Sequence, residues 1–286
     1  MKKGILIFAH NTREIDYAKM AIASGGLATK HLGVPATLVT DKSTQDWMKE
    51  SGTYSKATEV FENIILVDRP ESGKVRAHSD GTQKFVSQWN NINRPSAWNV
   101  TPYDRTLLLD CDYFVLSDSL NNYWDVDSDL LISEAYNDIY NAKRTGYLDK
   151  FVSAEGVEML WATTVMFTKN EYTKTFFDLV EHIRQNYETF ADLFRFDYRT
   201  YRNDISFSVA YHIMNGFEKN NNHYLPPVLS TPGFDMLYDV VDGKFVFLVS
   251  PMHDDNYCVA SIKDQDIHIM NKSSVERNID KIMELL

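Results

Sequence analysis

Two aspartates, Asp110 and Asp112, follow a short run of leucines in the segment DRTLLLDCDYFVLSD. Apolar chain resumes directly after them with Tyr113 and Phe114, so both carboxylates are expected beside buried chain. Two like charges there repel each other and lose hydration, which costs free energy unless a cation compensates them. In an extended segment residues i and i+2 point the same way, so we expect both carboxylates to face one spot.

Paired carboxylates of this kind suit a hard divalent cation. Mg²⁺ and Mn²⁺ prefer oxygen ligands and often bind through one or two carboxylates together with substrate phosphates. A D-x-D pattern alone has low specificity, because the chain also contains DVDSD at 125–129 and DQD at 264–266, which are typical of turns or solvated loops. The apolar context of Asp110 and Asp112 distinguishes them and predicts a metal–diphosphate site.

A sheet has to position these aspartates. Short apolar runs typical of buried strands occupy residues 4–10, 36–41, 63–68, 106–112 and 129–135. Helical patterns alternate with them, as in residues 16–33, where apolar residues repeat at helical spacing up to Gly33. This alternation predicts an α/β fold with a mostly parallel central sheet and flanking helices. Ligands of such sheets bind beyond the carboxyl ends of the strands, where Asp41, Asp68 and Asp110 lie.

The second half of the chain mixes strands and helices. The patterns predict strands over 159–169, 244–250 and 266–271, and helices over about 171–193, 204–216 and 274–286. Asp204 is a candidate N-cap of the second helix, which ends at Gly216. No internal repeat and no linker rich in Pro, Gly or Ser divides the sequence, so we expect one domain over 1–286.

Composition narrows the class of protein. The 286 residues carry 29 Lys+Arg against 40 Asp+Glu, a formal net charge of −11, which argues against broad clamping of nucleic acid but permits a local basic groove. No run approaches the roughly 18 to 20 apolar residues of a membrane span. The first apolar stretch stops at His10 without a cleavage site, and Cys111 and Cys258 are too few for a disulfide framework. We therefore expect an uncleaved cytoplasmic protein.

The segment YDRTLLLDCDYFVLSDSL resembles the D-x-D strand of GT-A-fold nucleotide-sugar glycosyltransferases, particularly glycogenin-like and galactosyltransferase-like members. The resemblance implies a single GT-A-like, Rossmann-related domain, with residues 1–135 as the nucleotide-sugar-binding half and 136–286 as the acceptor-side half. It implies that Asp110 contacts ribose or metal and that Asp112 binds the metal. The third metal ligand of the family is a late histidine followed by a lysine, and DIHIMNK supplies His268 and Lys272. Lys272 would then neutralise the leaving diphosphate.

Two further regions resemble the donor-binding elements of the family. GILIFAHN and ATLVTD correspond to the first two strands of the nucleotide pocket, although surface loop residues are the alternative interpretation of their polar ends. TQKFVSQW resembles the helix before the D-x-D strand, where a lysine or arginine helps to hold the donor. The residues that the resemblance assigns to the donor are His10, Asn11, Arg13, Asp41, Arg76 and Lys84.

The acceptor side shows both a departure and a match. WATTVMF occupies the place of the family's N-x-G strand, and Trp161 with the two residues after it replaces Asn and Gly, so the sugar pocket is shaped differently. RNDISFSVAYHIMNG resembles the segment that lines the reaction centre, with Asn203 and Asp204 in place. The resemblance therefore places Asp204, or less favourably Glu158, near the anomeric carbon.

A more specific resemblance is to glycosyltransferase-like proteins of tailed phages, in IDYAKMA, VTD, the D-C-D strand, WAT, RND-x-x-FS and H-x-MNK. Some phages glycosylate hydroxymethylated bases in their own DNA and others decorate glycans, so both are candidate acceptors. A DNA acceptor would require base flipping and a basic rim. Candidates for that rim are Lys143, Arg144, Arg195, Arg199 and Arg202, although solvated helix faces explain them equally well.

The expected reaction is transfer of a sugar from a nucleoside diphosphate sugar, with UDP as the expected nucleotide, to a hydroxyl. Asp110, Asp112 and His268 would hold Mn²⁺ or Mg²⁺ against the phosphates. Resemblance to glycogenin-like enzymes implies retention, whereas inversion would need a carboxylate as general base. A nucleotidyltransferase is disfavoured, because such enzymes usually carry a glycine-rich phosphate-binding loop after the first strand and FAHNTREID contains no glycine. The alternative outside the enzymes is a non-catalytic protein that binds a nucleotide or a glycan.

Overall fold

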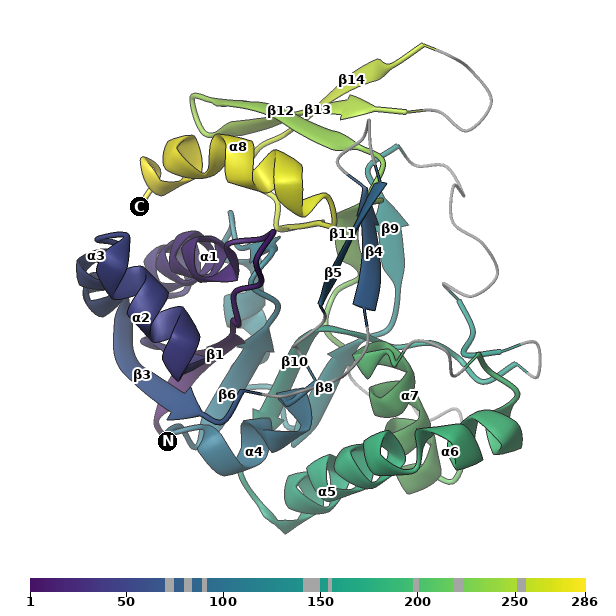
Figure 1. Ribbon diagram of the computed structural model, residues 1–286. Helices are drawn as coiled ribbons and strands as arrows, with labels where there is room; N and C mark the ends of the chain where they lie inside the picture. The colour runs from purple at the N-terminus through teal and green to yellow at the C-terminus, as the bar shows by residue number, and fades with distance from the viewer. Residues whose placement is uncertain are drawn as a thin grey trace.

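The structure is a computed structural model, and it describes residues 1–69, 75–79, 84–88, 92–140, 150–153, 156–197, 201–218, 224–250 and 256–286. At its centre lies a six-stranded sheet with helices on both faces (Figure 1). Within the described ranges, no helix combines the length and the apolar character that crossing a membrane would require.

The central sheet is mostly parallel, as predicted. Its order is β3-β2-β1-β6-β10-β8, and β3, β2, β1 and β6 pair in parallel. β10 runs antiparallel to both of its neighbours, so five of the six strands share one direction. The strands are β1 Lys3–Phe8, β2 Ala36–Asp41, β3 Phe61–Val67, β6 Arg105–Leu109, β8 Leu130–Ser133 and β10 Trp161–Thr168.

Successive residues of β1 divide the core between the two faces of the sheet. Ile5 and Ile7 pack into the cluster under α1, whereas Leu6 and Phe8 pack into the cluster under α5 and α7. This is the alternation expected of a strand that is buried on both sides. The helices of the first face are α1 Tyr17–Leu32, α2 Lys42–Glu50 and α3 Tyr54–Val60; those of the second are α4 Ala97–Val100, α5 Glu171–Gln185, α6 Tyr187–Phe194 and α7 Asn203–Met214.

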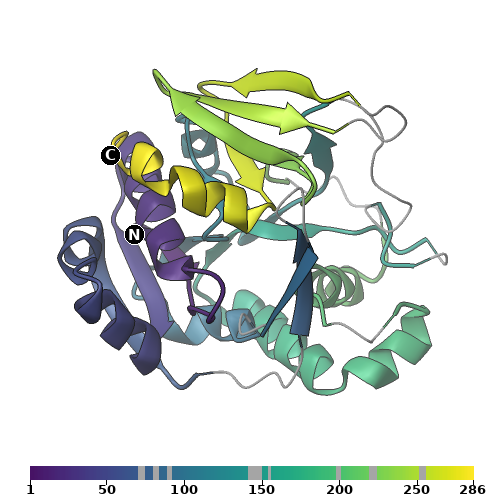
Figure 2. The same ribbon diagram turned by 45° about the horizontal axis from the view of Figure 1, so that its top comes forward.

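Smaller sheets lie beyond the carboxyl ends of the parallel strands (Figure 2). A four-stranded sheet has the order β7-β15-β11-β9, and a three-stranded sheet β12-β13-β14 lies beside α8. The strands are β7 Tyr113–Phe114, β9 Tyr136–Asp138, β11 Val228–Thr231, β12 Met236–Val241, β13 Lys244–Val249, β14 Cys258–Ile262 and β15 Ile267–Ile269. The last helix, α8 Lys272–Met283, packs against α1 and β12. The smaller sheets and α8 bring the C-terminal part of the chain to the edge of the central sheet where Asp110 and Asp112 lie.

The single helix predicted over 171–193 is wrong, because α5 ends at Gln185 and α6 begins at Tyr187. Asn186 separates them with a non-helical backbone (φ −114°, ψ 34°). Its Nδ2 donates a 2.9 Å hydrogen bond to the carbonyl oxygen of His182. Asparagine side chains compete in this way with the helical backbone pattern, which explains the break.

The helix predicted for TQKFVSQW is also wrong. Residues Lys84–Gln88 form β5, which pairs antiparallel with β4, Val75–Ser79. Phe85 packs against the core and Ser87 is buried, while Val86 between them is 56% exposed. This two-residue period is the pattern of a strand.

Candidate functional site

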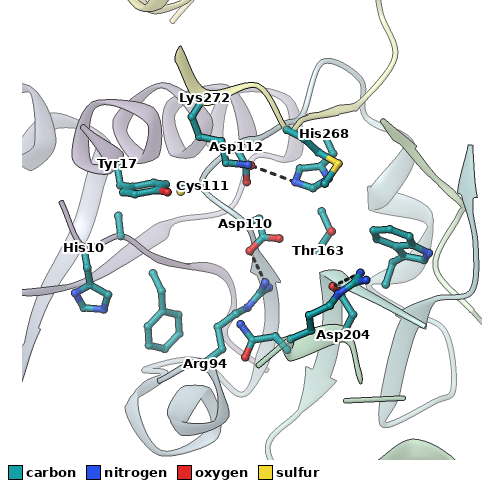
Figure 3. A pocket seen from close by; sticks show the side chains of 16 residues that line it. His10, Tyr17, Arg94, Asp110, Cys111, Asp112, Thr163, Asp204, His268 and Lys272 are labelled. Carbon is teal, nitrogen blue, oxygen red and sulfur yellow. Dashed lines mark hydrogen bonds and ion pairs between the residues drawn. The ribbon is translucent and has the colours of Figure 1, made fainter. Parts of the chain in front are cut away.

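A pocket lies at the carboxyl ends of β1 and β6 (Figure 3). Its walls come from the segments that follow these strands, from β10, from the start of α7 and from the β15–α8 junction. The residues that line it are Phe8, Ala9, His10, Tyr17, Arg94, Asp110, Cys111, Asp112, Trp161, Thr163, Arg202, Asn203, Asp204, His268, Met270 and Lys272. This is the edge at which α/β sheets bind ligands.

The two aspartates lie in a turn, so the predicted extended geometry is wrong. β6 ends at Leu109, and the amide of Tyr113 donates to the carbonyl oxygen of Asp110 (3.1 Å). The amide of Asp110 in turn donates to the carbonyl oxygen of Thr163 in β10 (3.0 Å). The apolar chain after the turn belongs to β7, which turns back to pair with β15 rather than extending β6. The two carboxylates nevertheless converge, because the turn directs both into the pocket (Figure 3).

His268 reaches the aspartates through strand pairing. β15 pairs antiparallel with β7, which sets His268 opposite Tyr113, and the amide of Ile269 donates to the carbonyl oxygen of Asp112 (3.0 Å). The His268 Nε2 atom lies 3.2 Å from Asp112 Oδ2, and Nδ1 lies 3.4 Å from Ser230 Oγ. One ligand atom each from Asp110, Asp112 and His268 lie within 4.8 Å of one another. The three residues named by the sequence as metal ligands are thus brought together.

Each aspartate also has its own cation. Arg94 Nη1 donates to Asp110 Oδ1, and Lys272 Nζ donates to Asp112 Oδ2. Arg94 is only 2% exposed, and its Nε and Nη2 atoms have no hydrogen-bond partner among the described residues. The sequence prediction missed Arg94 and chose Lys84 for the basic residue that precedes the D-x-D. The sequence offered one sign of Arg94: it lies nearer to Asp110 along the chain than Lys84 does, in the segment NRPS, where residues Arg94–Ser96 form a 3₁₀ turn.

The two carboxylates differ in their electrostatic environment. Burial raises the pKa of Asp110 above its ordinary value, and Arg94 only partly opposes this effect. Burial acts on Asp112 as well, but the charges and hydrogen bonds of Lys272 and His268 outweigh it and lower the pKa of Asp112 well below its usual range. Between them, burial raises the pKa of the Cys111 thiol, so this side chain is a neutral part of the wall.

Asp204 is not the N-cap of its helix. α7 begins at Asn203, Arg202 takes the cap position, and Asp204 lies in the first turn. Its Oδ1 atom accepts a hydrogen bond from the amide of Ala162 (3.0 Å), and Oδ2 lies 3.4 Å from Arg202 Nη2. The carboxylate is therefore tied to β10 and lines the pocket.

Trp161 forms the neighbouring wall. Its indole stacks on Tyr136 at 4.9 Å between ring centroids, and the guanidinium of Arg202 lies 6.0 Å from the indole centroid on a cation–π contact. The indole is only 3% exposed, so it lines the pocket as a fixed edge rather than as an open stacking surface.

At the opposite end of the pocket lies His10 (Figure 3). Its Nδ1 atom is 2.9 Å from Asp41 Oδ2, and its Nε2 atom is 3.3 Å from Asn93 Oδ1. Asp41 also caps α2 by accepting the amide of Thr44 (2.9 Å). Burial would raise the pKa of Asp41, but hydrogen bonds from His10 and Ser43 outweigh it and lower that pKa below its ordinary value. Asp41 does not line the pocket and instead orients His10.

Several predicted residues are not brought to the pocket. Asn11 is buried and accepts the amide of Ala18 in α1 (2.8 Å), while Arg13 and Glu158 are exposed and do not line the pocket. Arg76 and Lys84 lie in the β4–β5 hairpin, and their side chains are outside the described part of the chain.

The predicted basic rim is only partly described. Arg202 lines the pocket, and Arg195 is exposed at the end of α6. Lys143, Arg144 and Arg199 lie outside the described residues. Of the five rim candidates, the structure therefore describes two and places one at the pocket.

No protein-family model and no curated protein matches the chain. The fold of the chain is similar to that of several solved glycosyltransferase structures. The galactosyltransferase LgtC in complex with donor and acceptor sugar analogs is 14% identical, with 73% of this chain and 70% of that chain covered and a TM-score of 0.45. GlyE of Streptococcus pneumoniae TIGR4 is 13% identical (75% and 43% covered, TM-score 0.41). Mouse xyloside xylosyltransferase 1 is 11% identical (79% and 85% covered, TM-score 0.41).

Proposed function

We propose that the protein is a metal-dependent glycosyltransferase, which moves a sugar from a nucleoside diphosphate sugar to a hydroxyl acceptor. The observation that carries the proposal is the convergence of Asp110, Asp112 and His268 within 4.8 Å at the carboxyl edge of the sheet. The three residues come from a turn and from a strand 156 residues later, and the strand pairing between β7 and β15 holds them together.

The donor set fits Mn²⁺ or Mg²⁺. Two carboxylates and one imidazole are ligands that hard and borderline divalent cations accept, and only one oxygen of Asp110 is engaged by Arg94. Asp110, Asp112 and His268 would hold the ion, and the bound ion would neutralise the diphosphate of the donor.

Two cationic side chains, Lys272 and Arg94, would also stabilise the negative charge of the diphosphate. Negative charge grows on the diphosphate as the glycosidic bond breaks, and Lys272 lies beside Asp112 where it can stabilise that charge. Arg94 has two buried nitrogen atoms without a partner among the described residues, and each unmade hydrogen bond costs about 1–3 kcal/mol. Oxygen atoms of the donor would satisfy these nitrogen atoms, so we assign Arg94 to donor binding, together with Lys272.

The nucleotide and the sugar occupy opposite ends of the pocket in this proposal. His10, oriented by Asp41, lies at the end where the first two parallel strands finish and would face the nucleoside, with UDP as the proposed nucleotide. Asp204 lies at the other end, anchored by the amide of Ala162, and would lie near the anomeric carbon. Retention is the proposed stereochemical course, and the anomeric configuration of the product, read by NMR, tests it.

The proposed acceptor is a hydroxyl on a modified DNA base or on a glycan. Arg202, which lines the pocket, supports a DNA acceptor, since an arginine is expected beside a site for a flipped base. Salt-sensitive binding that is stronger for hydroxymethylated than for unmodified duplex DNA is the result that a phage-type DNA acceptor requires. Absence of DNA binding at low salt would leave a glycan as the acceptor.

The decisive experiment is calorimetric binding of UDP with and without Mn²⁺. We expect Mn²⁺ to tighten UDP binding in the wild type. In the presence of Mn²⁺, Asp112→Asn should bind UDP at least about tenfold more weakly than the wild type. Asp127→Asn is the matched control, because Asp127 lies in the exposed D-x-D of DVDSD and should behave as wild type. Metal-independent binding in all three proteins, repeated with other nucleoside diphosphates, would exclude the proposed function.

A further inference from the structure

The carboxylate of Asp266 joins the segment after the aspartate turn to the segment before His268. Its Oδ1 atom accepts the amides of Leu116 (2.8 Å) and Ser117 (2.9 Å) and the hydroxyl of Ser117 (2.9 Å). Its Oδ2 atom lies 3.4 Å from the hydroxyl of Ser119. Asp266 and Ser117 are 149 residues apart in the sequence, so this side chain is a long-range connection.

This connection supports a very short ladder. β7 and β15 pair through only two residue pairs, one of which is His268 with Tyr113. So few pairs give little stability by themselves. Asp266 lies directly before β15, and its donors lie two to five residues after β7, so the carboxylate closes the open end of the ladder.

Parallel pairing with β11, in which Ser230 lies opposite His268, holds the other edge of β15, and the β7–β15 ladder sets the position of the His268 ring relative to the aspartates. The imidazole makes two polar contacts: 3.2 Å to Asp112, at the long end of the usual range, and 3.4 Å to Ser230, beyond it, so these contacts alone hold the ring weakly. The backbone of β15 therefore sets where the ring lies. A shift of β15 along or away from β7 would move the imidazole relative to both aspartates.

We propose that Asp266 is a positioning residue that holds His268 in register with Asp110 and Asp112. Asp266 does not line the pocket and so acts only through the strand that it fastens. The inference deepens the proposed function, since it concerns the same metal ligands. Its central claim, that Asp266 fastens β15 to β7, is a property of the metal-free protein.

The test compares Asp266→Ala with Asp266→Asn and with a matched control, Arg105→Gln. Arg105 is 5% exposed and donates to the carbonyl oxygens of Tyr123, Val126 and Ser128 and to the hydroxyl of Thr168. It fastens a loop at the start of β6, whereas the aspartate turn lies after the end of that strand. Both substitutions remove a polar connection, but only Asp266 joins β7 to β15.

Two readouts are measured on each protein. Hydrogen exchange at the Ile269 amide, which donates to Asp112, reports on the ladder without metal. Electron paramagnetic resonance of free Mn²⁺ reports the metal affinity. For Asp266→Ala we expect Ile269 to exchange about tenfold faster and Mn²⁺ to bind about tenfold more weakly. Asp266→Asn should be intermediate, because its amide oxygen still accepts backbone N–H groups, and Arg105→Gln should match the wild type in both.

Unchanged exchange at Ile269 in Asp266→Ala, or equal acceleration in Arg105→Gln, would overturn the inference. If Asp266→Ala does not fold, the same comparison between Asp266→Asn and Arg105→Gln decides it. A wild type that binds no Mn²⁺ would refute the proposed function, whereas the exchange data would still decide the role of Asp266.

Discussion

At the scale of single residues, the site is a set of charges arranged in pairs. Buried Asp112 has Lys272 and half-buried Asp110 has the buried Arg94, so each carboxylate is compensated within the chain. Compensation of this kind makes the removal of one partner costly, because the other charge is left buried and unpaired.

Arg94→Gln should therefore lower the free energy of unfolding by about 3 kcal/mol. Part of that loss should return in the double variant Arg94→Gln/Asp110→Asn, which removes both charges. Urea unfolding of the two single variants and the double variant measures the coupling. Strictly additive losses would show that Arg94 and Asp110 do not stabilise each other.

Asp41 makes a pH-dependent contribution to the free energy of unfolding, and the lowered pKa of its carboxyl group gives the sign of that contribution. A carboxyl group whose pKa is depressed by folding stabilises the protein above its unfolded pKa of about 3.9 and loses this contribution as the pH falls through the folded value. Asp41→Asn should thus be less stable than wild type at pH 7, and the difference should shrink below about pH 4.

Urea unfolding at several pH values between 7 and 2 checks this expectation. Asp46→Asn is the control on the same helix, because Asp46 forms only an exposed pair with Lys42. A difference between Asp41→Asn and wild type that stays constant down to pH 2 would contradict the assigned role of Asp41.

At the scale of elements, the sequence predicts what local patterns encode. The parallel strands and their order of appearance follow from short apolar runs that alternate with helical periods, and the structure confirms them. The turn at Asp110–Asp112 was not predictable in this way. The chain bends there because β7 pairs with β15, a partner more than 150 residues away that no local window contains.

The residues of the site divide along the same line. Asp110, Asp112, His268, Lys272 and Asp204 could be named from the sequence, because a family resemblance marks their positions. Arg94 could not be selected from the sequence. The resemblance calls for a lysine or an arginine before the D-x-D strand, several such residues precede that strand, and only the fold shows which one reaches Asp110. The β5 strand was missed because its two-residue period is short and TQKFVSQW also fits a helix.

Two adjacent glycines in α1 provide a prediction at this scale. A Cβ atom on Gly25 would lie 2.6 Å from Cε1 of the buried Phe61 ring, whereas one on Gly26 would lie 2.6 Å from the flexible end of Leu286. Gly25→Ala should destabilise the protein by about 1–3 kcal/mol despite the better helix propensity of alanine. Gly26→Ala should be neutral or stabilising, because Leu286 can rotate away.

Thermal and urea unfolding of the two variants, made side by side, tests this pair. The same loss of stability in both would show that helix packing, and not the Phe61 contact, decides the cost.

At the scale of the whole molecule, strand β10 joins segments from the two halves of the sequence in one sheet. It comes from the second half of the sequence and lies between β6 and β8, which belong to the first half. Helix α8 likewise packs against α1. We therefore propose that the halves 1–135 and 136–286 are functional regions of one domain rather than separate folding units.

A fragment of residues 1–135 should accordingly fail to fold by itself, since β6 and β8 would lack the strand between them. The expected result is a poorly dispersed amide NMR spectrum and no cooperative unfolding transition, in contrast to the intact chain. A well-dispersed spectrum for this fragment would refute the single-unit interpretation.

The late position of His268 and Lys272 has a consequence for synthesis in the cell. They follow Asp112 by 156 and 160 residues, so the ribosome makes the aspartate turn long before it makes their partners. Until β15 and the start of α8 emerge, the nascent chain holds two carboxylates with an incomplete ligand set. The proposed capacity to bind a metal–nucleotide complex should thus appear only after β15 and the start of α8 have been made, later than the central sheet.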